Sequence, residues 1–215
     1  TGDAAPVFST NFSLSNKVRR AVLHITALGV YEARINNCRA GEFILAPGWT
    51  AYPERLQYQS YDVTDLLKEA NELQVLVGRG WYRSRMPGWK SSDYMKLLQT
   101  NPSALLAQLE ITYADGSAET LVSDESWSVA ESPDCPKSPV RCFDGPSHTL
   151  IPQQGEEIRE QERLHPASVF VTPKGETVID FGQNLTGYVE ISLSAQKGQV
   201  VALSFAEVMD IEGNF

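Results

Sequence analysis

The chain has 215 residues, with 18 Lys and Arg against 27 Asp and Glu, so its formal net charge is −9. Its composition, 42% hydrophobic and 21% charged, is typical of globular proteins and argues against disordered and fibrous classes. No run approaches the roughly 18 to 20 apolar residues that cross a bilayer. The acidic balance disfavours nucleic acid, because neutralising phosphates needs a basic face. We therefore predict neither a membrane nor a nucleic-acid partner.

Targeting, disulfide and metal signals are weak. The first residues, TGDAAPVFST, lack a basic region followed by an apolar stretch, so no signal peptide is predicted in this segment, and localisation stays open. Three cysteines are too few for a disulfide framework. Cys135 and Cys142 flank a Pro-rich hexapeptide and could pair, but reduced thiols are the favoured interpretation. The three histidines lie far apart without ligand spacing, so no structural zinc site is predicted.

Alternating apolar residues predict strands in the first part of the chain. Leu23 and Ile25 share one face of the segment 22–26, and His24 lies on the opposite, solvated face. Residues 31–35 alternate in the same way. Asn36-Asn37 follows, and because Asn tolerates positive φ, this pair predicts a tight hairpin turn.

The same period of two returns over 73–77 and 105–113, and Asp115-Gly116 then predicts a hairpin to a strand over 119–122. Residues 62–67 predict one short helical turn that Thr64 or Asp65 caps. No amphipathic helix longer than two turns is predicted. Short strands with regular turn signals indicate an all-β fold, a β-sandwich or jelly roll.

The pattern changes after Trp127, and we predict three regions: a sandwich over 1–132, a solvated Pro-rich connector over 133–166, and a second, smaller antiparallel β unit over 167–215. Four strands are expected in the last region, with a turn at Lys197-Gly198 between the final two. These strands are predicted over 168–172, 177–181, 189–195 and 200–208.

So few strands are marginal as an independent sandwich, so this second unit is expected to be incomplete and to belong to a longer protein. The apolar segment 200–208 then becomes an exposed strand edge. It is expected to pair with the sandwich, with a neighbouring molecule or with a second copy in a homodimer. The alternative is that the connector covers it.

Catalytic motifs are not recognisable. Asp180-Phe181-Gly182 matches the magnesium tripeptide of kinases, but the other kinase motifs are missing. No nucleophile elbow, zinc-protease motif or phosphate loop is present. Acids are plentiful, yet a glycosidase pair must face one cleft at a defined separation, which spacing on short strands does not establish.

Aromatic residues are the one suggestive feature. They gather in one predicted loop region around 49–61, at Trp49, Tyr52, Tyr58 and Tyr61, and in another around 81–89. Sugars stack their C–H faces on such rings, while polar neighbours hydrogen-bond the hydroxyls. The alternative is that the rings fill the core. Neighbouring glycines and Pro87 favour a loop around the second group. The candidate carbohydrate-binding residues are Trp49, Trp81, Tyr82, Arg83 and Trp89.

Several blocks carry a family resemblance. They are ALGVYEARINNCRAGEFILAPGWTAYPERLQYQSYDVTDLL, NELQVLVGRGWYRSR, DFGQNLTGYVEISL and AEVMDIEGNF. In this order the blocks resemble the bacterial α-L-rhamnosidases of glycoside hydrolase family 78, from about Phe8 to the end of the chain. The first part is similar to the family's amino-terminal, galactose-binding-like β-sandwich. The DFGQN block is similar to the opening of the next β-domain.

The resemblance implies a parent enzyme that hydrolyses terminal α-L-rhamnosyl groups with inversion, using two carboxyl groups. In that family the catalytic residues sit on an (α/α)6 barrel that follows these β-domains, and no segment here predicts that barrel. This piece is therefore expected to be inactive and to brace its own downstream barrel. Which rhamnoside the parent cleaves is not readable.

Two alternatives remain: a carbohydrate-binding module for glycans that contain L-rhamnose, or a sugar-binding domain of another glycoside hydrolase, such as a β-glucuronidase or β-galactosidase. Some relatives of this sandwich bind L-rhamnose with calcium nearby. No cluster of oxygen ligands is readable here, so no cofactor is predicted and calcium stays open.

Overall fold

The computed structural model describes residues 5–84, 102–132, 135–144 and 149–215. The chain divides into two compact units, Thr1–Glu160 and Gln161–Phe215, and each is described by itself. Strands dominate the first unit, and the second has a single pair of strands. In the described ranges, helix is confined to the short α1 (Gly80–Arg83) and a 3-10 turn, η1 (Thr64–Leu66). This all-β composition confirms the predicted fold class.

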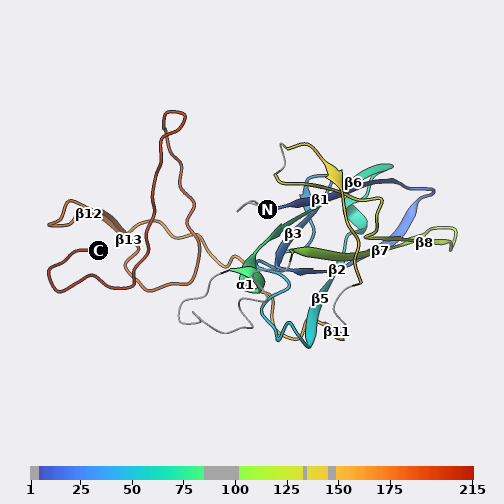
Figure 1. The fold of residues 1–215 in the computed structure, drawn as a ribbon, viewed down its shortest axis with the longest axis horizontal. Helices are drawn as coiled ribbons and strands as arrows, with labels where there is room; N and C mark the ends of the chain where they lie inside the picture. The colour runs from blue at the N-terminus through green and yellow to red at the C-terminus, as the bar shows by residue number, and fades with distance from the viewer. Residues whose placement is uncertain (1–4, 85–101, 133–134, 145–148) are drawn as a thin grey trace. The chain divides into compact units, whose positions relative to one another are not determined.

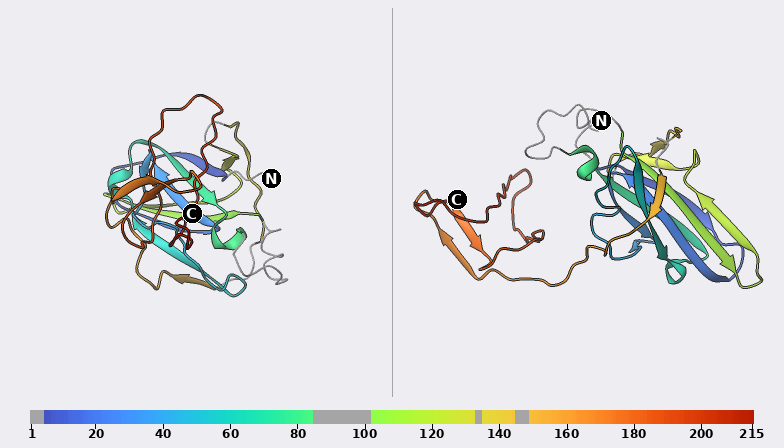
Figure 2. Two further views of the ribbon diagram at one scale, coloured as in Figure 1. Left: turned by 90° about the vertical axis from the view of Figure 1, so that its left-hand side faces the viewer. Right: turned by 90° about the horizontal axis from the view of Figure 1, so that it is seen from below.

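The first unit is a sandwich of two sheets (Figures 1 and 2). The six-stranded sheet has, in spatial order, β10 (Ser138–Pro139), β9 (Ser128–Ala130), β1 (Val7–Ser13), β6 (Ala70–Gly78), β3 (Val30–Ile35) and β4 (Cys38–Arg39). The five-stranded sheet has β11 (Thr149–Pro152), β5 (Arg55–Asp62), β2 (Val18–Leu28), β7 (Ala104–Tyr113) and β8 (Ala118–Val122). Neighbouring strands are antiparallel, except that β11 runs parallel to β5.

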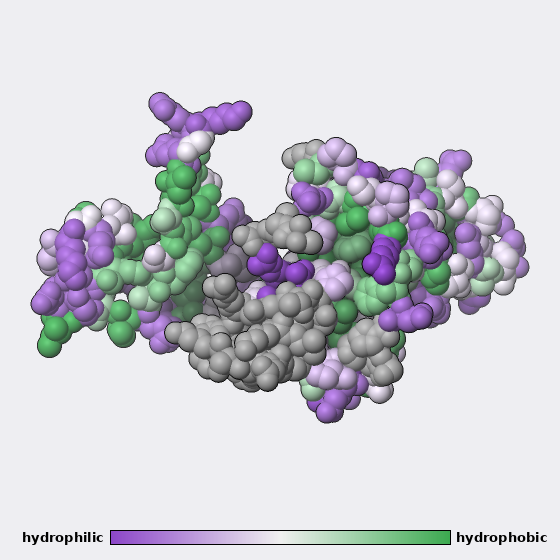
Figure 3. Space-filling model, viewed as in Figure 1, coloured by the Kyte–Doolittle hydropathy of each residue, from purple (hydrophilic) through white to green (hydrophobic). Residues whose placement is uncertain are grey.

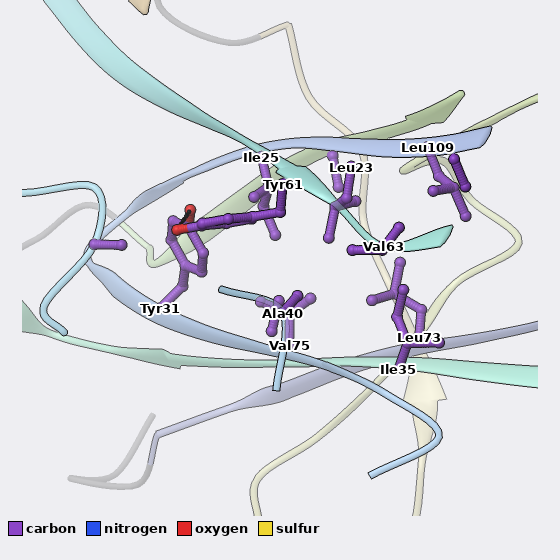
Figure 4. Close-up of a cluster of buried hydrophobic side chains, with 14 of the residues drawn as sticks. Leu23, Ile25, Tyr31, Ile35, Ala40, Tyr61, Val63, Leu73, Val75 and Leu109 are labelled. Atoms are coloured by element: carbon purple, nitrogen blue, oxygen red, sulfur yellow. Dashed lines mark hydrogen bonds between the residues drawn. The ribbon is translucent and has the colours of Figure 1, made fainter. Parts of the chain in front are cut away.

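The core lies between the two sheets (Figure 4). Leu23 and Ile25 of β2 are buried there, as are Val75 and Val77 of β6, so the predicted inward faces are confirmed. Since successive side chains on a strand point to opposite faces, the residues between them point away from this core. The outer face of β2 therefore carries His24, as the alternation predicts.

The predicted hairpin turn at Asn36-Asn37 is present. Ile35 pairs with Cys38 across a two-residue loop, and the φ angles of Asn36 and Asn37 are 52° and 67°. Two successive positive φ values are those of a type I′ turn, whose twist matches that of the flanking strands. The Asn36 side chain adds hydrogen bonds to the carbonyl of Leu66 and to Asn71. The prediction is confirmed.

The helical turn also occurs, but its cap differs from the predicted one. Asp62 Oδ1 accepts hydrogen bonds from the backbone N–H and the hydroxyl of Thr64, at 3.0 and 2.6 Å. Neither Thr64 nor Asp65 caps the turn, because Asp62 precedes it at the spacing that an Asx turn needs.

The structure differs from a solvated connector over 133–166. Two short strands form there: β10 pairs with β9, and β11 pairs with β5. Both lie at sheet edges, where Pro139 and Pro152 are tolerated because an edge strand does not need every N–H for its ladder. The three regions expected from the sequence stay a prediction, but part of the Pro-rich segment is integral to the sandwich.

The second unit has one two-stranded antiparallel sheet, β12 (Ser168–Val171) and β13 (Thr177–Asp180), at the positions predicted. The strands predicted over 189–195 and 200–208 are not formed, since residues 182–215, all of them described, contain no strand. The turn between them is present: Gln199 N–H donates to the carbonyl of Gln196.

Apolar side chains are exposed in the two segments that flank this turn, 189–195 and 200–208, as the green part of the projecting arm in Figure 3 shows. Val200, Phe205 and Val208 are 87%, 75% and 82% exposed. The strand prediction is wrong here. Alternation of apolar residues indicates only that one face of the segment favours burial, whereas a strand also needs a neighbouring strand to which its backbone hydrogen-bonds.

Candidate functional site

Part of the predicted aromatic site, Tyr52 and Tyr82, forms a small hydrophobic core that is separate from the main one. Tyr52 and Tyr82 are 1% and 3% exposed, and their rings meet edge to face with centroids 5.1 Å apart. Leu28 and Leu56 complete this cluster, and Trp81 packs against it half-buried. Tyr82 is buried, as expected if the rings fill a core.

Trp49 lies at the surface. It is 51% exposed, in the loop that leads to Tyr52. Arg83 donates from Nη1 to the Ser103 hydroxyl at 3.3 Å, and its buried Nε has no hydrogen-bond partner among the described residues. Trp89 lies outside the described residues. Tyr52 and Tyr82 thus bring the 49–54 loop and α1 together.

Two tyrosines of the first aromatic group lie on strand β5 rather than in a loop. Tyr61 is 7% exposed and belongs to the main core, whereas Tyr58 is half-buried on the outer face of the sheet. The ring of Tyr58 meets the His24 ring edge to face, with centroids 6.2 Å apart. The expectation of one aromatic loop is therefore wrong for these two residues.

Around His24 the outer face of the five-stranded sheet carries a polar group that the sequence did not single out. His24 Nδ1 lies 2.7 Å from the Ser60 hydroxyl on β5, and Nε2 lies 3.8 Å from Glu110 Oε2 on β7. Gln108 Nε2 donates to Glu110 Oε1 at 2.7 Å. The sequence does predict that His24 faces outward, but which side chains lie beside it depends on the strand register.

A buried polar network closes one edge of the sandwich. The Tyr31 hydroxyl donates to Gln59 Oε1 at 2.7 Å, and Gln59 Nε2 donates to Gln153 Oε1 at 2.8 Å. The hydroxyl oxygens of Tyr31 and Tyr61 are 3.2 Å apart (Figure 4). Gln153 follows β11, so this network ties the Pro-rich segment to the core.

Burial raises the pKa of Tyr31 well above its usual value, and the Tyr61 hydroxyl and the Glu157 carboxylate act in the same direction. Burial also raises the pKa of Tyr61, although its hydrogen bond with Tyr31 opposes the rise. Both hydroxyls therefore stay protonated, and they serve structure rather than proton transfer.

Some site types find no support in the part of the chain that the structure describes. It places no three or more His, Cys, Asp or Glu residues together as metal ligands, and it has no helix long and apolar enough to cross a membrane. Cys38, Cys135 and Cys142 are free and exposed. Two open depressions among the described residues lie along 11–13 with 70–72 and along 14–18 with 64–65 and 67–69, and neither is lined by a candidate residue.

Comparison with known families gives two matches. Residues 16–145 match the family described as the α-L-rhamnosidase N-terminal domain, and residues 170–215 match the bacterial α-L-rhamnosidase concanavalin-like domain. The first match covers more than half of the chain.

Individual relatives agree with these families. An α-L-rhamnosidase of Streptomyces avermitilis is 36% identical over 99% of this chain, and one of Alteromonas sp. is 31% identical over 96%. The chain spans only 24% and 25% of their lengths.

Solved structures are similar as well. The α-L-rhamnosidase of Aspergillus terreus superposes with a TM-score of 0.75 at 33% identity, over 86% of this chain and 25% of that one. The Streptomyces avermitilis enzyme in complex with L-rhamnose gives 0.74 at 34%, over 85% of this chain and 20% of that one. The chain therefore belongs to the α-L-rhamnosidase family and corresponds to the amino-terminal region of its members.

Proposed function

We propose that the full-length protein hydrolyses terminal α-L-rhamnosyl groups with inversion, and that these 215 residues brace a catalytic domain that lies outside them. One observation carries the proposal: nearly the whole chain aligns with α-L-rhamnosidases, but it spans only about a quarter of their length. Inversion requires a carboxylic acid and a carboxylate on opposite sides of the sugar ring. The proposal assigns neither role to an acid of this chain.

The test uses 4-nitrophenyl α-L-rhamnoside and two proteins, the full-length protein and the 215-residue chain. The full-length protein is expected to release nitrophenol and to give a product of inverted anomeric configuration by proton NMR. The 215-residue chain is expected to match the buffer blank. An inactive full-length protein contradicts the proposed activity, and an active 215-residue chain contradicts the bracing role.

Carbohydrate binding is the second candidate function, and the exposure of Trp49 favours it. An exposed indole face is what sugar stacking requires. Trp49→Ala is expected to weaken the binding of L-rhamnose, measured as heat of binding with and without calcium, with little loss of thermal stability. Tyr52→Ala is the matched control, because Tyr52 is 1% exposed and its loss removes core packing. A large fall in melting temperature for Trp49→Ala contradicts a binding role.

For a partner, we propose a homodimer through the exposed segment 200–208. Unpaired backbone beside apolar side chains accepts another strand. Light scattering at several concentrations is expected to show dimers that dissociate on dilution. Phe205→Lys is expected to shift the population to monomers, because a buried charge without a partner is costly. A chain that stays monomeric at every concentration rules this proposal out.

A further inference from the structure

Five side chains form what we call the outer platform of the five-stranded sheet: His24 on β2, Tyr58 and Ser60 on β5, and Gln108 and Glu110 on β7. The register explains why they meet. His24 pairs with Ser60 on one side and with Gln108 on the other, so all three lie in one row across adjacent strands. Strands are about 4.8 Å apart, so such a row spans about 10 Å.

Contacts within the platform hold its side chains in place. Ser60 and Tyr58 fix the His24 ring, through a 2.7 Å contact at Nδ1 and an edge-to-face contact. Gln108 is held by its 2.7 Å hydrogen bond to Glu110. A preorganised set of side chains loses little conformational entropy when a ligand binds.

The platform also keeps groups that a ligand can use. The distance of 3.8 Å from His24 Nε2 to Glu110 is too long for a hydrogen bond, so that ring nitrogen still has bonding capacity. The side chains of His24 and Glu110 are 32% and 53% exposed, and Ser60 and Gln108 are exposed too. Tyr58 is partly exposed beside them.

At one end the platform meets the small aromatic core described above. Along β2, Thr26 and Leu28 follow His24 on the same face, and Leu28 belongs to the cluster of Tyr52 and Tyr82. Thr26 is 2% exposed between them. The aromatic core therefore lies at one end of the outer platform and bounds it on that side.

This combination selects the chemistry of the ligand. Aromatic rings beside hydroxyl, amide and imidazole groups suit a molecule with apolar C–H faces and many hydroxyls. Glu110 and the net charge of −9 disfavour an anionic ligand. A protein partner would need a more continuous apolar centre, whereas the middle row here is polar.

We infer that the outer platform is a binding site for a neutral glycan, with His24, Ser60 and Gln108 hydrogen-bonding hydroxyls and Tyr58 contacting a sugar face. The inference rests on the proposed function only for the choice of sugar. It places binding on a sheet face rather than on the loop of Trp49.

The chain offers a built-in reporter, because it has only three histidines. We would titrate methyl α-L-rhamnoside into the isotope-labelled 215-residue chain and follow the imidazole C–H signals, with His24→Asn to assign the His24 signal. That signal is expected to shift saturably, while the other two stay in place. Binding is expected to weaken about tenfold in Tyr58→Ala and in Gln108→Ala.

Asn11→Ala is the matched control, since it also removes an exposed strand amide, but from β1 of the other sheet. It is expected to bind as the wild type does. The inference is overturned by an unmoved His24 signal, by equal binding of galacturonate, or by binding that only Trp49→Ala removes. None of these outcomes bears on rhamnoside hydrolysis by the full-length protein, so the two proposals fail separately.

Discussion

The buried hydroxyl of Tyr31 offers a sharp test of the packing argument. Tyr31→Phe removes one oxygen and leaves the ring in place. Gln59 Oε1 then loses the donor that lies 2.7 Å away, and the Tyr61 hydroxyl loses its neighbour at 3.2 Å. Because Gln59 is 2% exposed, water does not readily replace the lost donor.

Leaving such a buried acceptor unsatisfied costs about 1–3 kcal/mol. A domain of this size loses about 2–4 °C of melting temperature for each kcal/mol. We therefore expect Tyr31→Phe to melt several degrees below the wild type. Gln59→Leu is expected to cost a similar amount, and the double variant less than the sum, because both variants break one network.

Urea and thermal unfolding, followed by circular dichroism, measure these losses. Tyr113→Phe is the matched control, since the Tyr113 hydroxyl donates to Glu119, an exposed residue on a hairpin. It is expected to cost clearly less. Equal losses for Tyr31→Phe and Tyr113→Phe, or strict additivity with Gln59→Leu, would refute the reasoning.

The same network predicts a pH dependence. The pKa of Tyr31 is raised in the folded state, so its contribution to stability is complete below the unfolded pKa of about 10 and is lost progressively as the pH rises above it. Tyr31→Phe is expected to flatten the alkaline part of the stability profile. A slope that does not change with this substitution would contradict the burial argument.

Three further predictions follow from local geometry. Gly41→Ala is expected to cost at least about 1 kcal/mol more than Gly48→Ala in thermal unfolding, because both glycines have positive φ but only the Gly41 Cβ would overlap the Tyr61 ring; equal costs would contradict the overlap. Asn37→Gly is expected to be neutral or stabilising and Asn37→Val to cost about 1 kcal/mol or more, so equal melting temperatures would rule out the strained turn. Hydrogen bonds from Thr64 hold the pKa of Asp62 below its usual value, so its stabilisation is present above about pH 3.9 and lost as the pH falls through the lower folded value. Asp62→Asn should then show a shallower acid transition, and an identical one would refute this.

Much of the sandwich was predictable because its strands face a core on one side only. Alternation at Leu23 and Ile25 identifies β2, and the tolerance of Asn36-Asn37 for positive φ locates the hairpin that joins β3 to β4. Strands β10 and β11 were not predictable, because prolines mask their pattern and their pairing depends on edges made by distant segments.

The candidate site was less predictable, since a sequence does not state which rings meet. Trp49 and Tyr82 look alike as aromatic residues near glycines, yet one is half exposed and the other lies in a small core. The outer platform was missed because it depends on the register of β2 with β5 and β7. A register shift of one residue in any of these strands would turn that strand's platform side chains to the other face.

In the second unit, the alternation of apolar residues predicts strands that the structure does not have. Residues 189–208 alternate as clearly as β2 does, and their turn closes through the hydrogen bond of Gln199 to Gln196. What differs is the neighbourhood: β2 has β5 and β7 on its two sides, whereas the sheet of β12 has only β13. An isolated pair of strands is at best marginally stable in water, so local alternation alone does not order a further hairpin. The segments 189–195 and 200–208 therefore need a surface that covers their apolar side chains before they can form a sheet. This is the physical basis for expecting the second unit to associate.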